Sequence, residues 1–156
     1  RSTLFPYTTL FRSRSTMRLK GYSPFDVVIC YGIIFPHCIM DSPNTSKWIL
    51  NITNDAWFKQ TDGPYQHIKA ACFRAIEQGR AIARCANNGI SCIINCNGKI
   101  LQKLNTDTIG IIHYKMPLKY QSTIYSKYGN IIILFILSVF FILLTYIVHI
   151  RPKLHS

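Results

Sequence analysis

Acidic residues are scarce in this sequence. It has 6 Asp and Glu against 18 Lys and Arg among 156 residues, a formal net charge of +12. Charged residues make up 15% of the chain and hydrophobic residues 49%, whereas a typical soluble domain is roughly 25% charged. This balance excludes a disordered, highly solvated chain. Eight glycines and seven prolines are too few for a collagen-like or low-complexity polymer, and the length suits one domain.

The six cysteines also lack the spacing of a metal site. No two form a C-x-x-C pair, and the closest two, Cys92 and Cys96, lie along a predicted strand. A structural zinc site needs ligand pairs at turn spacing, so we expect neither a metal nor a cofactor. An even number of cysteines would permit three disulfides, but their dispersal within apolar segments favours free thiols.

The excess of positive charge has more than one interpretation. The basic residues are scattered and no nucleic-acid-binding motif is present, so we expect no nucleic-acid partner. Anionic lipid headgroups are the surface that a basic domain beside a membrane would meet. A solvated basic face explains most of the lysines equally well, and that alternative stays open.

The first thirteen residues do not resemble a folded segment or a leader. The stretch that ends at Ser13 matches the in-frame translation of a common sequencing-library adapter, and it lacks the long apolar region and cleavage site of a signal peptide. We therefore interpret residues 1–13 as an adapter-derived artefact. On this interpretation the natural sequence begins near Arg14, and the chain is a fragment without its natural N-terminal part.

Residues 131–150 form one continuous apolar run without a formal charge. About 20 residues at 1.5 Å each span roughly 30 Å, the thickness of the hydrocarbon core of a bilayer. A helix that is apolar on all sides cannot be buried against so small a domain, so a transmembrane helix over residues 129–150 is favoured over a core helix. Arg151 and Lys153, in the short basic tail 151–156, favour a cytoplasmic C-terminus. Lys115, Lys119 and Lys127 before the helix weaken that orientation.

Residues 14–128 have the pattern of an α/β domain. Short apolar runs at 26–30 and 48–52 predict strands that are buried on both faces. Asp62-Gly63-Pro64 predicts the start of a helix, with Asp62 as its cap, that runs roughly from Tyr65 to Gly79. The buried face of this helix is predicted by the spacing of five residues, Ile68, Ala71, Cys72, Ala75 and Ile76.

An antiparallel meander is predicted after this helix. Asn87-Asn88-Gly89 and Asn97-Gly98 are turn signals between apolar segments. The expected strands cover residues 82–86, 90–95, 99–104 and 109–114. The order of strands, helix and meander indicates a layered α/β sandwich that the chain enters partway through.

Cys30 is the sharpest candidate for chemistry. It ends the first predicted strand, and Tyr31-Gly32 follows, where the chain can turn sharply. A thiol there can lie at the edge of the sheet beside backbone N–H groups, which is the arrangement that covalent acyl transfer needs. On spacing alone, a buried structural cysteine is the more common outcome.

The other polar candidates are less specific. Glu77 has Arg74 three residues before it and Arg80 three residues after it, so structural ion pairs are favoured over a general-base role. Asn54-Asp55-Ala56-Trp57-Phe58 follows the second strand, where loops carry function in α/β folds. An Asx-capped turn with Trp57 as a core anchor is an equal alternative.

Taken together, these residues resemble apolipoprotein N-acyltransferase, the membrane-bound branch of the nitrilase superfamily. The similarity covers about residues 22–150 and includes the closing transmembrane helix. It rests on blocks in matching order, which are Ile29-Cys30-Tyr31-Gly32-Ile33-Ile34-Phe35-Pro36, Thr53-Asn54-Asp55-Ala56-Trp57-Phe58, Gly63-Pro64-Tyr65-Gln66-His67, Arg74-Ala75-Ile76-Glu77 through Arg80, Asn87-Asn88-Gly89-Ile90 and Asn97-Gly98-Lys99-Ile100.

The resemblance implies a fold, a reaction and a location. The fold would be the C-terminal part of a nitrilase-like α-β-β-α sandwich followed by one transmembrane helix. Cys30 would take an acyl chain from a phospholipid as a thioester and pass it to the N-terminal amine of a diacylglyceryl lipoprotein. Tyr31 and Gly32 would be its neighbours, with Asn54, Asp55, Trp57 and Phe58 in the active-site motif. The protein would lie in the bacterial inner membrane, with its catalytic domain on the periplasmic side.

The sequence departs from the family pattern at two positions near Cys30. Gly32 and His37 stand where the family ordinarily has acidic residues. The catalytic Glu and Lys of the family lie upstream of the nucleophile, outside this chain, and Glu77 is not that glutamate. We therefore expect this polypeptide alone to be inactive. A gain of acyl mass at Cys30 after incubation with phospholipid would contradict this expectation.

Two other functions stay open. A membrane-anchored amide hydrolase of the same superfamily would use the same cysteine with water as the acceptor. A degenerate, non-catalytic membrane module is the second alternative, and Gly32 is the residue that keeps it open. The transmembrane helix and the Asn-Asp-Ala-Trp-Phe block favour the transferase.

Overall fold

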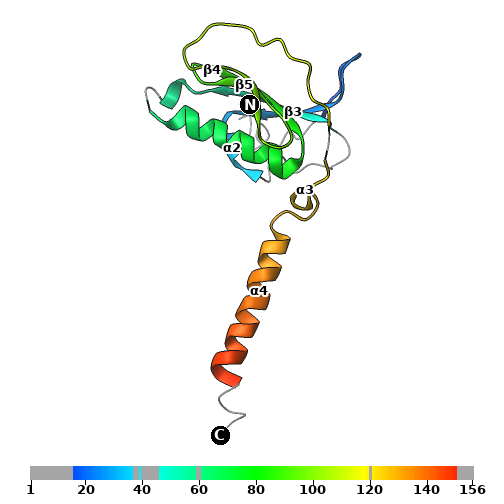
Figure 1. Ribbon diagram of the computed structural model, residues 1–156, viewed down its shortest axis with the longest axis vertical. Coiled ribbons are helices and arrows are strands. Elements are labelled where there is room, and N and C mark those ends of the chain that lie inside the picture. The colour runs from blue at the N-terminus through cyan, green and yellow to red at the C-terminus, as the bar shows by residue number, and fades with distance from the viewer. Residues whose placement is uncertain (1–15, 37–38, 40–45, 59–60, 120, 151–156) are drawn as a thin grey trace, which may run out of the picture.

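The computed structural model describes residues 16–36, 39, 46–58, 61–119 and 121–150. Figure 1 shows an α/β unit at one end of a long, projecting helix. Six strands form one sheet in the order of the sequence. β2, β3 and β4 are parallel, and the other neighbouring strands are antiparallel. The strands are β1 (Thr16–Met17), β2 (Phe25–Ile29), β3 (Trp48–Asn54), β4 (Ala81–Asn87), β5 (Ser91–Ile94) and β6 (Ile100–Leu104).

The core lies between one face of the sheet and helix α2 (Gly63–Gln78). Register places Ile49 of β3 beside Ile82 of β4, and both are fully buried together with Ala71 and Ala75 of α2. Strand alternation puts Ile52 on the opposite face, where it is 47% exposed. The two faces of the sheet therefore differ: α2 covers one, and apolar side chains are accessible on the other.

α2 agrees with the predicted helix except at its cap and at one apolar position. Asp62 makes no capping hydrogen bond, and the helix ends at Gly79, which has φ +60° and donates its N–H to the carbonyls of Ala75 and Ile76. Ile68 is buried as predicted, with Ala71 and Ala75. The prediction that Ile76 belongs to the buried face is wrong, because its side chain lies against the Gly98 turn instead of the core.

The predicted meander is confirmed for its first three strands. β4, β5 and β6 are joined by turns in which Asn88 has φ +56° and Gly98 has φ +76°. The predicted strand at 109–114 is wrong, since this segment joins no ladder and both Ile109 and Ile111 are almost fully exposed. Its alternating isoleucines mimic a strand, but the chain turns away after β6 at Asp107, which has φ +54°.

The chain then returns to the C-terminal end of α2 before the projecting helix begins. The N–H of Gln121 donates to the carbonyl of Gly79 at 3.0 Å, and the Thr123 hydroxyl donates to the carbonyl of Glu77. Thr123 also caps the short helix α3 (Ile124–Tyr128) in a capping box with Ser126. Gly129, with φ +54° and ψ −134°, ends α3 and leads into the last helix.

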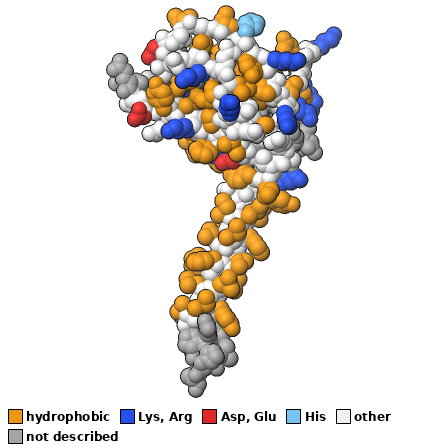
Figure 2. Space-filling model, viewed as in Figure 1, with side chains coloured by type: hydrophobic (Ala, Val, Ile, Leu, Met, Phe, Trp, Pro, Cys, Tyr) orange, Lys and Arg blue, Asp and Glu red, His pale blue; other side chains and the backbone are white. Residues whose placement is uncertain are grey.

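This last helix consists of α4 (Ile131–Thr145) and a π-helical turn, η4 (Tyr146–Ile150). Hydrophobic side chains cover its surface (Figure 2), and no residue of α4 is buried. Within the described part of the chain, residues 131–148 form the one helix that is long and apolar enough to cross a membrane. The helix coincides with the apolar run that the sequence indicated.

Candidate functional site

Cys30 lies at a sharp bend directly after β2. The strand ends at Ile29, one residue earlier than predicted, and Cys30 begins a 3-10 helix, η1 (Cys30–Ile34). Its φ of +46° is in the left-handed region, which a residue with a side chain rarely adopts. Such a conformation costs on the order of 1–3 kcal/mol and persists only where the surrounding structure holds it. The half-buried thiol thus lies in a strained bend directly after a parallel strand.

Two neighbours of Cys30 were predicted to belong to the site. Tyr31 is 48% exposed, and its ring lies 5.4 Å from the ring of His67 and 6.0 Å from that of Phe58. Gly32 is buried, and a Cβ on it would lie 3.2 Å from Cγ1 of Val28. The other departure from the family pattern, at His37, lies outside the described residues.

The Asn54–Phe58 segment begins at the last residue of β3, beside the end of β2. Ile29 of β2 and Ile52 of β3 are register partners in parallel strands. The Cys30 bend and the Asn54–Phe58 segment therefore both leave the sheet at the carboxyl ends of these strands. The Asn54 side chain accepts a hydrogen bond from the N–H of Ala56 at 3.1 Å, as in an Asx turn. Trp57, in the 3-10 helix η3 (Ala56–Phe58), is 80% exposed. The Asx-turn interpretation is therefore right, whereas the core-anchor interpretation of Trp57 is wrong.

Asp55 belongs to a buried polar network behind this edge. Its carboxylate lies 2.7 Å from Nη2 of Arg84 and 2.9 Å from Nδ1 of His67, and it accepts a hydrogen bond from Thr53 at 3.1 Å. Asn51 accepts from Nη1 of Arg84 at 2.5 Å. Burial alone would raise the pKa of Asp55, but the His67 hydrogen bond and the Arg84 charge lower it below its ordinary value.

Sequence reasoning did not assign His67 or Arg84 to the site. His67 belongs to the Gly-Pro-Tyr-Gln-His block of the family resemblance, and Arg84 is a charged residue inside an apolar strand segment. A buried charge of this kind needs a partner of opposite charge. Between β2 and Arg84, the described residues contain three carboxylates, Asp55, Asp62 and Glu77. That signal pointed to a pair, although the sequence did not identify Asp55 as the partner.

The predicted ion pairs around Glu77 form only in part. Arg74 pairs with Glu77 at 2.8 Å. Arg80 pairs instead with Asp26 of β2 at 2.6 Å and also donates to the Ser46 hydroxyl and the Ile39 carbonyl. The reason is Gly79, whose left-handed backbone ends the helix and takes Arg80 off the helical spacing that the prediction assumed. Burial raises the pKa of Glu77, and Arg74 offsets part of this increase.

The remaining cysteines differ in their access to solvent. Five cysteines are unpaired in the described residues, and Cys38 lies outside them. Cys85 is exposed, whereas Cys92 is fully buried, and burial raises the pKa of Cys92 to about 12. Across the described ranges, no group of three or more His, Cys, Asp and Glu residues could hold a metal ion.

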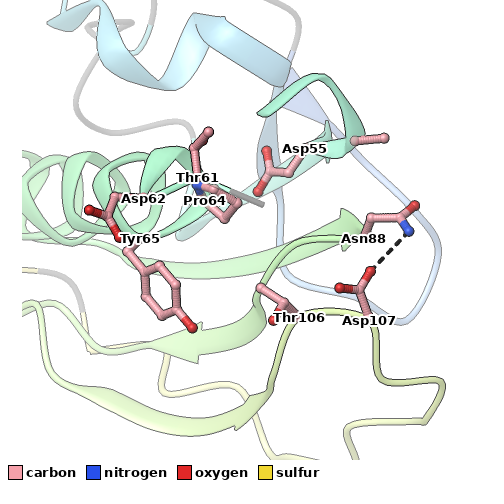
Figure 3. A pocket seen from close by; sticks show the side chains of 9 residues that line it. Asp55, Thr61, Asp62, Pro64, Tyr65, Asn88, Thr106 and Asp107 are labelled. Atoms are coloured by element: carbon pink, nitrogen blue, oxygen red, sulfur yellow. Dashed lines mark hydrogen bonds between the residues drawn. The ribbon is translucent and has the colours of Figure 1, made fainter. Parts of the chain in front are cut away.

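A polar pocket adjoins Asp55 on the side of the β4–β5 turn (Figure 3). Its volume is about 480 Å³. Three carboxylates line it, and Asn88 donates a hydrogen bond to Asp107 at 3.1 Å. The lining residues are Asp55, Ala56, Thr61, Asp62, Pro64, Tyr65, Asn88, Thr106 and Asp107. This lining suits a polar or cationic group better than an acyl chain.

The chain is similar to known enzymes over most of its length. The carbon-nitrogen hydrolase family matches residues 7–125. An apolipoprotein N-acyltransferase from Rickettsia bellii is 47% identical over 118 residues, which are 75% of this chain and 23% of that protein. One from Rhodopseudomonas palustris is 39% identical over 119 residues, which are 76% of this chain and 22% of that protein. The chain thus spans about a quarter of the length of these curated relatives.

A solved structure supports the fold. The crystal structure of Saccharomyces cerevisiae Nit3, a member of branch 10 of the nitrilase superfamily, superposes with a TM-score of 0.50. The match covers 60% of this chain and 37% of that one, at 23% identity. At this identity the likeness concerns the fold alone, and it agrees with the mixed sheet and its covering helix.

Proposed function

Because the chain belongs to the carbon-nitrogen hydrolase family, we propose that it is part of a membrane-bound N-acyltransferase that transfers an acyl chain from a phospholipid to the N-terminal amine of a lipoprotein. The relatives at 39–47% identity carry the name of this activity. The apolar helix at the end of the chain supports a membrane location. The observation that carries the proposal is the left-handed bend at Cys30, beside the Asn54–Phe58 segment.

The proposed reaction has two steps. In the first, the sulfur of Cys30 attacks the carbonyl carbon of a phospholipid acyl ester; the ester C–O bond breaks, and the lysophospholipid oxygen takes up the thiol proton. In the second, the amine nitrogen of the acceptor attacks the thioester carbonyl. The C–S bond breaks, an amide forms, and a proton from the amine returns to the sulfur. The net change is an ester exchanged for an amide.

The proposed location follows from the same features. α4 would cross the bacterial inner membrane, with the α/β unit on the periplasmic side and the C-terminus in the cytoplasm. A phospholipid donor and a membrane-anchored lipoprotein acceptor would both then be held in the layer that the helix enters.

A chimera tests the function. The aligned 118 residues would replace their counterpart in the Rickettsia bellii relative, and the product would be incubated with phospholipid and a diacylglyceryl lipopeptide. Mass spectrometry would follow acyl-enzyme and acylated peptide. We expect both species with the unaltered chimera, and neither with Cys30→Ala. Cys85→Ala is the matched control, because Cys85 is an exposed thiol of β4, and it should leave the rate unchanged.

Other results would separate the alternatives. Retained transfer in Cys30→Ala would reject the proposed nucleophile. Loss of the acyl group to water, with no acylated peptide, would indicate a hydrolase. A chimera that forms no acyl-enzyme, beside an active Rickettsia bellii enzyme, would support the degenerate module that Gly32 keeps open.

A further inference from the structure

His67 connects the buried polar network to the residue that follows Cys30. It lies on α2, is 4% exposed, and stacks on the Tyr31 ring with the two ring planes 27° apart. On another side, the ring of Phe58 meets it edge-on at 5.8 Å. His67 therefore contacts both segments that leave the carboxyl ends of β2 and β3, one through Tyr31 and the other through Phe58.

The hydrogen bonds of His67 fix the tautomer of its ring. An ionised carboxylate can only accept hydrogen bonds, so Nδ1 of His67 must donate to Asp55 across the 2.9 Å contact. Nη2 of Arg84 donates to Asp55 at 2.7 Å and lies 3.1 Å from the same nitrogen, but an Nδ1 that carries a hydrogen cannot accept from it. Nε2 is buried and has no hydrogen-bond partner among the described residues. The ring is thus oriented by Nδ1 alone.

Asp55 can orient this ring because it is itself held in place. Arg84 and Thr53 bind its two oxygens, and the backbone of Gly89 closes the remaining side. A Cβ on Gly89 would lie 2.1 Å from Oδ2 of Asp55, so the two segments approach as closely as glycine allows. Rotation of the His67 ring would leave a buried carboxylate with one donor fewer, which is unfavourable.

Tyr31 needs such a support because it is half exposed and follows a strained residue. The left-handed backbone of Cys30 persists only if its neighbours hold it. Tyr31 is the next residue, and its aromatic contacts are with His67 and Phe58. Holding the Tyr31 ring restricts the backbone on one side of Cys30.

We propose that His67 is a positioning residue for Cys30: Asp55 orients its ring, and the ring face holds Tyr31 so that the adjacent thiol keeps its orientation. The proposal rests on the proposed function only in its use of Cys30 as the nucleophile. The structural coupling itself requires no substrate.

Alkylation of the complete chain tests this coupling. The 156-residue chain would be placed in nanodiscs of phosphatidylethanolamine and phosphatidylglycerol, treated with iodoacetamide, and mapped by peptide mass spectrometry. The measured quantity is the rate at Cys30 divided by the rate at exposed Cys85. Buried Cys92 reports on folding, because it reacts only if the core opens.

We expect His67→Ala to lower the Cys30 to Cys85 ratio roughly two- to tenfold, the effect expected of one aromatic contact. The ratio falls because the Cys30 thiol, when Tyr31 is no longer held, spends less time in the orientation that the bend gives it. Tyr31→Ala should lower the ratio at least as much, because it also removes the contact with Phe58. The double variant should add nothing to Tyr31→Ala, since both substitutions remove the same His67–Tyr31 contact. Phe73→Ala, an exposed ring on the same helix, is the matched control and should leave the ratio unchanged.

An unchanged ratio in His67→Ala with Cys92 still protected would overturn the proposal, as would additive effects in the double variant. If His67→Ala exposes Cys92, then Tyr31→Ala decides. A slower Cys30 with Cys92 still protected supports the proposal, and an unchanged Cys30 rejects it. Retained transfer in the Cys30→Ala chimera would reject the proposed function and leave this coupling standing.

Discussion

The resemblance drawn from the sequence implies an acidic residue at the position of Gly32, close to Cys30. The backbone of Gly32 lies outside the region reserved for glycine, and a Cβ there would lie 3.2 Å from Cγ1 of Val28. A side chain can therefore be added if Val28 moves by a few tenths of an ångström. The fold therefore does not require glycine at this position.

We expect Gly32→Asp to increase acyl transfer by the chimera on the order of tenfold, equivalent to ~1.4 kcal/mol of transition-state stabilisation. The physical reason is that a carboxylate beside the nucleophile orients its polar partners. Initial rates with phospholipid and lipopeptide would measure the change. Gly110→Asp is a matched control, because a Cβ there meets Leu104 at 3.1 Å, a similarly tight contact. An equal effect of both substitutions would contradict the prediction.

Asp55 gives the stability a defined dependence on pH. Burial alone would raise its pKa, but the His67 hydrogen bond and the Arg84 charge prevail, so the pKa in the folded state lies below the ordinary value. The folded state therefore binds fewer protons than the unfolded state. The stabilisation by Asp55 is complete above the unfolded pKa of about 4 and is lost as pH falls through the lower, folded pKa.

Urea unfolding of the complete chain between pH 6 and 3 would show this loss. We expect the free energy of unfolding to fall below about pH 4, and to fall less steeply in Asp55→Asn, which cannot titrate. Asp62→Asn provides the comparison, because Asp62 makes no capping hydrogen bond on α2. If the free energy of unfolding depends on pH identically in Asp55→Asn and the unaltered chain, then titration of Asp55 does not cause the loss of stability at low pH.

At the scale of secondary-structure elements, the sequence predicted those segments whose conformation depends mainly on their own residue types. The two Asn-containing turns, the β2 and β3 runs and α2 were predicted from residue types that favour those conformations. The segment at 109–114 was misassigned because alternation does not tell whether a ladder partner is available. The Cys30 bend was placed correctly within one residue, whereas the Asp55, His67 and Arg84 network joins three elements and depends on tertiary packing.

The end of α2 gives a prediction at this scale. Gly79 has φ +60°, and a Cβ on it would lie 1.7 Å from the carbonyl oxygen of Gln121. Gly79→Ala would therefore both strain the backbone and displace the segment before α3. We expect a loss of stability of about 1–3 kcal/mol from the strained backbone, and more from the clash.

Gly21→Ala separates these two contributions. Gly21 has φ +84° with nothing within 4 Å of the position of a Cβ, so its substitution reports strain alone. Thermal unfolding of both variants in nanodiscs would measure the difference. Equal losses in Gly79→Ala and Gly21→Ala would show that the contact with Gln121 contributes nothing.

At the scale of the whole molecule, an α/β unit that bears charged side chains is joined to a helix, α4, with no charged and no buried residue. Apolar side chains exposed to water along the whole helix are unfavourable, and a bilayer removes this cost. The unequal surfaces of the two parts, visible in Figure 2, therefore favour a location with one part in water and the other in lipid.

A charge in the middle of α4 should reduce insertion. We expect Phe140→Arg to disfavour insertion by roughly 2.5–3.5 kcal/mol, the value for a basic residue at a helix centre. Carbonate extraction of membranes from expressing cells would measure the retained fraction. Ser138→Ala is the control, because the Ser138 hydroxyl only bonds the Leu134 carbonyl within the helix. Equal retention of the arginine variant would argue that α4 does not cross the membrane.

The Gly129 backbone has a consequence for how the protein meets the bilayer. Its φ of +54° with ψ of −134° is a combination that side chains oppose, and it lies between the α3 turn and the first residue of α4. A change of a few tens of degrees in these two torsions would tip the α/β unit by a similar angle relative to the bilayer normal. If α4 spans a bilayer, as proposed, the Gly129 torsions would set which end of the sheet overhangs the headgroups, and so the direction from which a lipid tail could approach the proposed nucleophile, Cys30.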